Sequence, residues 1–149
     1  VKDLEQNDLY QVKGKLMSIS NKIDFMDMND VVLLRAQKKI LSILPKYFLY
    51  DKEEVLVADV QKRFSFRPKF TVQALNNEMV VEGSLFGHNF SVMNNGELVA
   101  AISKKVFSFG DSYEIEIIPN ENKELYLFLV IVIDQVIHES KKNGGSYNG

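Results

Sequence analysis

The sequence predicts a mainly β domain in which an antiparallel sheet closes into a barrel around one helix near the C-terminus. Two observations lead to this fold class. Most of the chain alternates apolar and polar residues with a period of two, which is typical of strands that bury one face. In addition, one apolar segment near the C-terminus has no polar side and therefore needs an enclosure.

The alternating segments are short and are separated by turn residues. The clearest turn is Asn94-Asn95-Gly96, whose residues adopt left-handed backbone angles at low cost. About eleven strands are predicted, at residues 9–17, 22–28, 31–38, 40–44, 46–51, 55–66, 70–75, 79–86, 89–93, 98–107 and 113–118.

The C-terminal segment is predicted to be a helix over about residues 123–141. Asn122 is a suitable N-terminal cap, Glu124 suits the first turn, and lysines followed by Asn143-Gly144 suit the end. Residues 125–133 are all apolar, and at ~100° per residue they cover every side of the helix. The helix must therefore be surrounded.

Length favours protein over lipid as the surroundings of this helix. The apolar stretch 125–137 spans ~20 Å at ~1.5 Å per residue, whereas a bilayer core is ~30 Å thick. It also contains Asp134. We therefore expect no transmembrane span, and a helix threaded through a closed sheet, which would also remove the sheet's edges.

The sequence contains an internal similarity at an offset of 43 residues. "ADVQKRFSFRPKFTV" (58–72) aligns with "AISKKVFSFGDSYEI" (101–115), so that Lys62 falls on Lys105 and Phe64 on Phe107. We predict a duplication of about residues 40–75 and 83–118. Its two copies would turn corners at 67–69 ("RPK") and 110–112 ("GDS").

Composition limits the number of domains and the class of partner. A chain of 149 residues with 46% hydrophobic content suffices for one domain, predicted at 9–141 after a lead-in at 1–8 and before a flexible tail at 142–149. The net charge of −2 gives no reason to expect a nucleic acid partner. With no cysteine and two histidines, neither a metal site nor another cofactor is expected.

Four segments in this order resemble the LURP-one-related family. They are "ILSILPKYFLYD" (40–51), "RFSFRPKFTV" (63–72), "KKVFSFGDSYEIEI" (104–117) and the apolar helix "LYLFLVIVIDQVIHE" (125–139). The resemblance covers about residues 9–139, and this short chain looks like a bacterial member. It implies a fold similar to the C-terminal domain of Tubby proteins and to phospholipid scramblases, with about twelve strands in a closed barrel around the hydrophobic helix.

The resemblance also suggests classes of function. Tubby domains bind phosphoinositides through basic surface residues, and scramblase relatives act at membranes with calcium. No residue-by-residue match to the Tubby lipid site is present here, and no acidic run resembles a calcium loop.

A hydrolase is the least favoured class. The Gly110-Asp111-Ser112 block leads into a strand rather than a helix and is interpreted as a corner rather than a nucleophile. Asp134 and His138 lie one helical turn apart and could pair, but we expect Asp134 to accept hydrogen bonds that fix the depth of the helix. We expect His88 to be exposed in a turn. We therefore expect no enzyme.

The basic residues carry the functional prediction. Residues 31–70 contain nine Lys or Arg and four acidic residues, so this segment carries +5 while the rest of the chain carries −7. Arg63, Ser65 and Arg67 are expected to alternate onto one face of a strand, and the neighbouring phenylalanines 64, 66, 107 and 109 to enter the core. The predicted ligand-binding residues are Lys62, Arg63, Arg67, Lys69, Lys104 and Lys105.

The sequence thus predicts a non-enzymatic binding module for anionic phospholipid headgroups, or for another phosphorylated ligand, on a basic barrel surface. The predicted location is the cytoplasm, including the membrane periphery. The alternative is a protein-interaction or regulatory scaffold with a protein partner.

Overall fold

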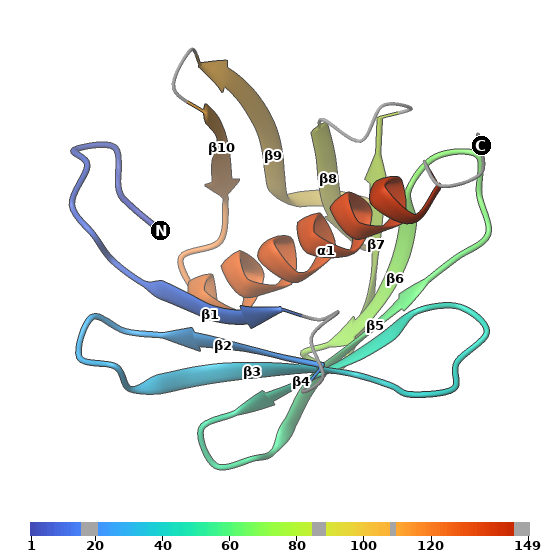
Figure 1. Ribbon diagram of the computed structural model, residues 1–149, viewed down its shortest axis with the longest axis horizontal. Coiled ribbons are helices and arrows are strands. Elements are labelled where there is room, and N and C mark those ends of the chain that lie inside the picture. The colour runs from blue at the N-terminus through green and yellow to red at the C-terminus, as the bar shows by residue number, and fades with distance from the viewer. Residues whose placement is uncertain (16–20, 85–88, 108–109, 145–149) are drawn as a thin grey trace.

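A computed structural model describes residues 1–15, 21–84, 89–107 and 110–144, with side chains described except at 15, 104–107, 110–113 and 138–144. Within this part, the chain forms one ten-stranded antiparallel sheet and one helix, and the strands follow one another in chain order (Figure 1). The strands are β1 (Gln11–Lys15), β2 (Lys22–Met26), β3 (Val32–Lys38), β4 (Lys46–Asp51), β5 (Leu56–Lys62), β6 (Lys69–Ala74), β7 (Asn77–Gly83), β8 (Asn89–Asn94), β9 (Glu97–Phe107) and β10 (Gly110–Ile117). The mainly β prediction is confirmed.

Alternation along the strands places one apolar face inside. In β6, Phe70 and Val72 are fully buried, whereas Lys69 and Thr71 between them are partly exposed. β4 and β7 show the same pattern. The inner faces together form one core that includes side chains from all strands between β2 and β9.

The helix α1 (Lys123–Gly144) lies inside the curved sheet (Figure 1). The backbone carbonyl of Asn122 accepts the first helical hydrogen bond, from the N–H of Tyr126. Every side chain from 125 to 137 is buried or half-buried, so the prediction of an enclosed helix is confirmed. Phe128 stacks on Phe25 of β2 with ring centroids 5.4 Å apart. Burial also raises the pKa of the Tyr126 phenol.

The sheet is not closed, so the predicted twelve-stranded barrel is not confirmed. β1 and β10 are its edges, and no ladder joins them within the described residues. Side chains connect this side of the sheet to the helix instead: the Tyr10 hydroxyl, just before β1, donates to the Glu124 carboxylate of α1 at 3.2 Å. The edges carry exposed charges at Lys13, Glu114 and Glu116, which discourage another strand from pairing with them.

Several predicted element bounds differ from those of the structure, most notably at residues 40–44, at the end of β5 and at the end of the helix. Residues 40–44 form a turn and bend between β3 and β4 rather than a strand, and β5 ends at Lys62 rather than at residue 66. The helix continues to Gly144, so the predicted tail keeps only residues 145–149, which lie outside the described part. Hydrogen-bond partners decide each boundary, because a strand continues only where a neighbouring strand pairs with it, and a helix continues only where each N–H reaches the carbonyl four residues earlier.

The "GDS" block is not a corner. Gly110 begins β10 and pairs with Phe107, and Ser112 pairs with Lys105 in β9. The block is therefore strand backbone, since the β9–β10 ladder extends two residues beyond Lys105. Residues 108–109, between the two strands, lie outside the described part.

Two strands repeat at the spacing of the predicted duplication. β8 begins 43 residues after β4 begins and ends 43 residues after β4 ends. The β4–β5 ladder shifts register between Leu49 and Tyr50, and the β8–β9 ladder shifts between Val92 and Met93, which are again 43 residues later. A duplication would produce both coincidences, but the duplication itself stays a prediction.

Alternating strand directions sort the connections onto two ends of the sheet. The β3–β4 and β5–β6 loops share one end, and we call residues 38–46 and 62–69 the basic rim. The β2–β3 and β4–β5 loops and the β10–α1 connection share the other end, and we call residues 27–31, 51–55 and 118–122 the acidic rim. The two basic-rim loops extend to the right of the view in Figure 1.

Candidate functional site

Four of the six predicted ligand-binding residues lie together at the end of the β5–β6 hairpin. Lys62 is the last residue of β5 and Lys69 the first of β6, while Arg63 and Arg67 lie in the loop between them. The Arg63 N–H donates to the Lys69 carbonyl at 2.9 Å, which closes the base of this loop. Arg63 and Arg67 are exposed, and Lys62 and Lys69 are partly buried.

Lys104 and Lys105 belong to a different part of the sheet. Both lie in β9, which β6, β7 and β8 separate from β5, and their side chains are outside the described part. The structure therefore does not bring these two residues into the β5–β6 hairpin. Their role in ligand binding stays a prediction.

The β3–β4 loop lies directly beside the β5–β6 hairpin. The Lys62 N–H donates to the Pro45 carbonyl at 2.9 Å, and the Gln61 amide nitrogen Nε2 lies 3.3 Å from the carbonyl oxygens of Leu44 and Pro45. These bonds hold the two loops side by side, where β4 begins and β5 ends. The basic residues of both loops consequently form one surface.

This surface has no acidic residue of its own. Residues 38–46 ("KKILSILPK") and 62–69 ("KRFSFRPK") contain seven Lys or Arg and no Asp or Glu. Two of the cations are paired with neighbouring strands: Lys46 with Asp59 at 3.5 Å, and Lys69 with Glu82 at 3.3 Å. Among the described residues, Lys39, Arg63 and Arg67 form no ion pair, so their charges face solvent.

Large apolar side chains lie among these cations. Phe64 and Phe66, which were predicted to enter the core, are 83% and fully exposed, so that prediction is wrong. They follow the end of β5, where no ladder directs them inward, and for the same reason Arg63, Ser65 and Arg67 do not alternate on a strand face. The side chains of Phe107 and Phe109 lie outside the described part.

The β3–β4 loop also encloses a hollow. Its volume is about 380 Å³, and it is lined by Asn21, Lys38, Lys39, Ile40, Leu41, Ser42, Ile43 and Pro45. The Ser42 hydroxyl donates to the Leu44 carbonyl and holds the loop in this shape. Two lysines at an otherwise neutral hollow suit an anionic group, so this hollow belongs to the candidate site.

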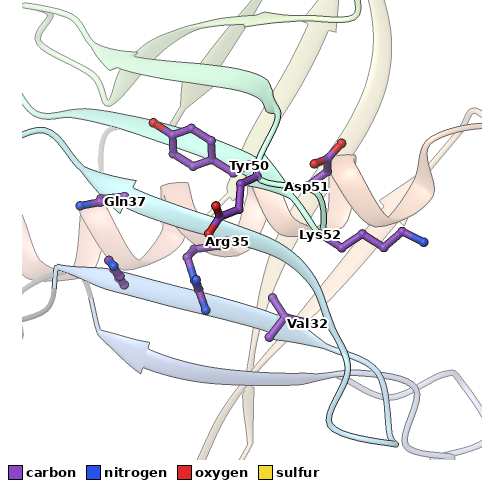
Figure 2. A pocket seen from close by; sticks show the side chains of 8 residues that line it. Val32, Arg35, Gln37, Tyr50, Asp51 and Lys52 are labelled. Carbon is purple, nitrogen blue, oxygen red and sulfur yellow. The ribbon is translucent and has the colours of Figure 1, made fainter.

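A larger hollow lies on the outer face of β2, β3 and β4 (Figure 2). Its volume is about 490 Å³, and Arg35 projects into it. The guanidinium forms a two-point contact with Asp24, at 2.6 Å from Nε and 3.1 Å from Nη2, and this hydrogen bonding raises the pKa of Arg35. Asp24 neutralises Arg35. The other charges of the lining also balance, with Lys22 and Lys52 against acidic residues 51 and 54. The hollow therefore suits an anion less well than the basic rim.

The other residues that the sequence singled out do not form a catalytic group. Ser112 and His138 have side chains outside the described part, and His88 lies wholly outside it. Asp134 is half-buried and has an interaction partner. Within the described residues, no three His, Cys, Asp or Glu side chains gather as a metal centre would need.

Sequence reasoning missed the contribution of Lys38, Lys39 and Lys46 to the site. The sequence places them in a segment of charge +5, but only the hydrogen bonds between the two loops show that they adjoin Arg63. A usable signal was present: each run lacks acidic residues, has cations at both ends and carries large apolar residues between them.

No helix in the described part of the chain is both long and apolar enough to cross a bilayer.

Comparison with known proteins gives a family and one curated relative. The chain is 27% identical over 140 residues to the "Uncharacterized protein YxjI" of Bacillus subtilis (strain 168), a match that covers 93% of this chain and 85% of that protein. No solved structure gives a significant match. The family model described as LURP-one-related matches residues 1–134, and the chain therefore belongs to the LURP-one-related family.

Proposed function

We propose that this protein is a non-enzymatic binding module that holds an anionic, phosphate-bearing group at the basic rim. One observation carries the proposal. Hydrogen bonds hold two basic loops, neither of which contains an acidic residue, side by side where β4 begins and β5 ends. In this proposal the protein acts in the cytoplasm, including the membrane periphery. A phospholipid headgroup and a free phosphorylated molecule share the required chemistry.

Different cations contribute in different ways. Arg63 and Arg67 are exposed, and a planar guanidinium can donate two parallel hydrogen bonds to a phosphate. Lys39 adds an exposed charge at the hollow of the β3–β4 loop. Near an anionic membrane each such side chain contributes ~1 kcal/mol, and the attraction falls off within a Debye length.

A charge-neutralising pair of substitutions tests the proposal. Arg63→Gln with Arg67→Gln should weaken binding to phosphatidylcholine vesicles that contain phosphatidylglycerol by about thirtyfold, from ~1 kcal/mol per side chain. Binding of inositol hexakisphosphate, a soluble phosphate-rich probe, should weaken as well. Co-sedimentation at low and high salt measures vesicle binding, and calorimetry measures binding of inositol hexakisphosphate.

The matched control removes two exposed lysines elsewhere. Lys2→Gln with Lys52→Gln lowers the net charge equally, but both lysines lie outside the basic rim and pair with acidic residues. This control should bind like the parent chain. If the parent binds neither vesicles nor the soluble probe at low salt, the proposal fails and the alternative, a protein-interaction or regulatory scaffold, takes its place.

A further inference from the structure

The loop tips of the basic rim expose apolar side chains far more than the acidic rim does. Five large apolar residues, Ile40, Leu41, Ile43, Phe64 and Phe66, have exposed fractions that run from 69% for Ile40 to complete exposure for Phe66. On the acidic rim the corresponding values lie between 46% and 56%, for Met28, Val31, Val55 and Ile118. The five residues come from two loops that hydrogen bonds hold side by side.

Leu41 shows that this exposure has a conformational cost. Its backbone has φ of 61°, in the left-handed region that disfavours residues with a bulky side chain. Its side chain is 99% exposed, so no packing within the chain compensates. Glycine or asparagine would fit this backbone better. An apolar side chain kept in strain and in water indicates a contact outside the chain.

The neighbouring charges identify the kind of contact. Lys38 and Lys39 precede the apolar tip of the β3–β4 loop and Lys46 follows it, while Arg63 and Arg67 bracket the two phenylalanines. Apolar side chains flanked by cations match a bilayer interface, where acyl chains lie beneath anionic headgroups. A free phosphorylated molecule would use the cations and leave the five apolar side chains in water.

We propose that the basic rim docks on an anionic lipid bilayer and inserts the tips of the β3–β4 and β5–β6 loops among the acyl chains. The inference rests on the proposed function and names the bilayer as the source of the phosphate-bearing group. Insertion at two adjacent loops fixes the orientation: the strands stand on the membrane by one end of the sheet, and the acidic rim points away from the anionic surface.

Single tryptophans report insertion directly, because the chain contains no tryptophan. Ile43→Trp and Phe66→Trp should shift their emission to shorter wavelength on phosphatidylcholine–phosphatidylglycerol vesicles and be quenched by brominated acyl chains. Val55→Trp, on the acidic rim at the other end of β4, is the matched control and should show neither change. Equal behaviour at all three positions would overturn the proposed orientation.

A polar pair of substitutions tests the energetic contribution. Leu41→Asn with Phe66→Ser should weaken binding to the same vesicles about a hundredfold, at about tenfold per side chain. Binding of inositol hexakisphosphate should stay unchanged, because all cations remain. Leu41→Asn suits the left-handed backbone, so a folding defect is not expected there, and thermal unfolding checks both variants.

The two binding assays separate the possible failures. If vesicle binding stays at the parent level in the polar pair while Arg63→Gln with Arg67→Gln abolishes it, insertion is wrong and the proposed function stands. If the soluble probe binds but the phosphatidylcholine–phosphatidylglycerol vesicles do not, the ligand is a free phosphorylated molecule and the bilayer inference fails. If neither binds, the proposed function itself fails.

Discussion

The two ends of the sheet connect the same strands with opposite chemistry. The basic rim carries seven cations, no acidic residue and five exposed large apolar side chains. The acidic rim carries six carboxylates and one lysine. Because β3, β4 and β5 contribute to both ends, the difference resides in the loops rather than in the strands. One fold thus presents two surfaces that would respond oppositely to an anionic partner.

The acidic-rim hairpins use their carboxylates to build the turn. Asp27 Oδ1 accepts hydrogen bonds from the N–H groups of Asn29 and Val31, at 2.8 and 3.0 Å. In the other turn, Asp51 Oδ1 accepts hydrogen bonds from the N–H groups of Glu53 and Val55, at 3.0 and 2.9 Å. The residue three positions after each aspartate, residue 30 or 54, has φ of 63°. The aspartate carboxylates and backbone N–H groups of these turns bond to one another, so they offer few hydrogen-bonding groups to a ligand.

The basic-rim loops lack such a carboxylate anchor and rely on backbone and hydroxyl bonds. The Lys39 N–H donates to the Lys46 carbonyl at 2.8 Å, and the Ser42 hydroxyl bonds within the loop. The cations without an ion pair among the described residues, Lys39, Arg63 and Arg67, and the exposed apolar side chains therefore remain available to a partner. The contrast shows that internal hydrogen bonding and the degree to which large apolar side chains are exposed separate a structural turn from a candidate binding loop.

The largest expected effect distinguishes two phenylalanines. Phe128 is fully buried in the second turn of α1, whereas Phe66 is fully exposed on the basic rim. Phe128→Ala should lower the free energy of unfolding by ~3–5 kcal/mol, because it leaves a cavity in the core shared by both rims. Phe66→Ala should change it by less than ~0.5 kcal/mol. Urea denaturation measures both, and similar losses would contradict the burial described here.

A smaller effect separates the two kinds of turn. Asp51→Ala removes the acceptor of two backbone hydrogen bonds and should lower the free energy of unfolding by ~1–2 kcal/mol. Ser42→Ala, the control on the basic rim, should cost ~0.5 kcal/mol or less. Asp51→Asn keeps an oxygen at the same place and should recover most of the loss in the same denaturation assay. A loss in Asp51→Asn as large as in Asp51→Ala would argue against this turn chemistry.

The smallest effect concerns pH on the acidic rim. Lys13 Nζ donates to Asp30 Oδ1 at 2.8 Å, and this hydrogen bond lowers the pKa of Asp30 below its ordinary 3.8. Because the pKa of Asp30 is lower in the folded state than in the unfolded state, the ionised carboxylate stabilises the fold at pH values above the unfolded pKa. That stability is lost as the pH falls through the folded pKa. Asp30→Asn should therefore make the urea midpoint less sensitive to acidification below about pH 5.

Glu121→Gln is the matched control for this pH experiment, because it removes a carboxylate from the same rim. Glu121 has no ion pair among the described residues, so its substitution should leave the acid sensitivity of the urea midpoint nearly as in the parent chain. Equal profiles for Asp30→Asn and the parent would show that the Lys13 contact does not contribute.

The candidate site was predictable only where it is local in sequence. Lys62, Arg63, Arg67 and Lys69 fall within eight residues, and the hairpin brings them together automatically. Lys38 and Lys39 join them because β4 carries the chain to the other end of the sheet and its neighbour β5 returns it to the same end. That proximity depends on strand order, which residue pattern alone does not specify.

The sequence by itself determined the strand alternation, the enclosed helix and the family. These follow from local rules, since side chains alternate across a strand and a helix that is apolar on all sides cannot face water. Tertiary structure alone decided that, among the described residues, the sheet stays open between β1 and β10, and that Phe64, Phe66 and residues 40–44 lie outside the core. Closure depends on the summed twist and curvature of ten strands, and an apolar residue is buried only where a ladder carries it inward.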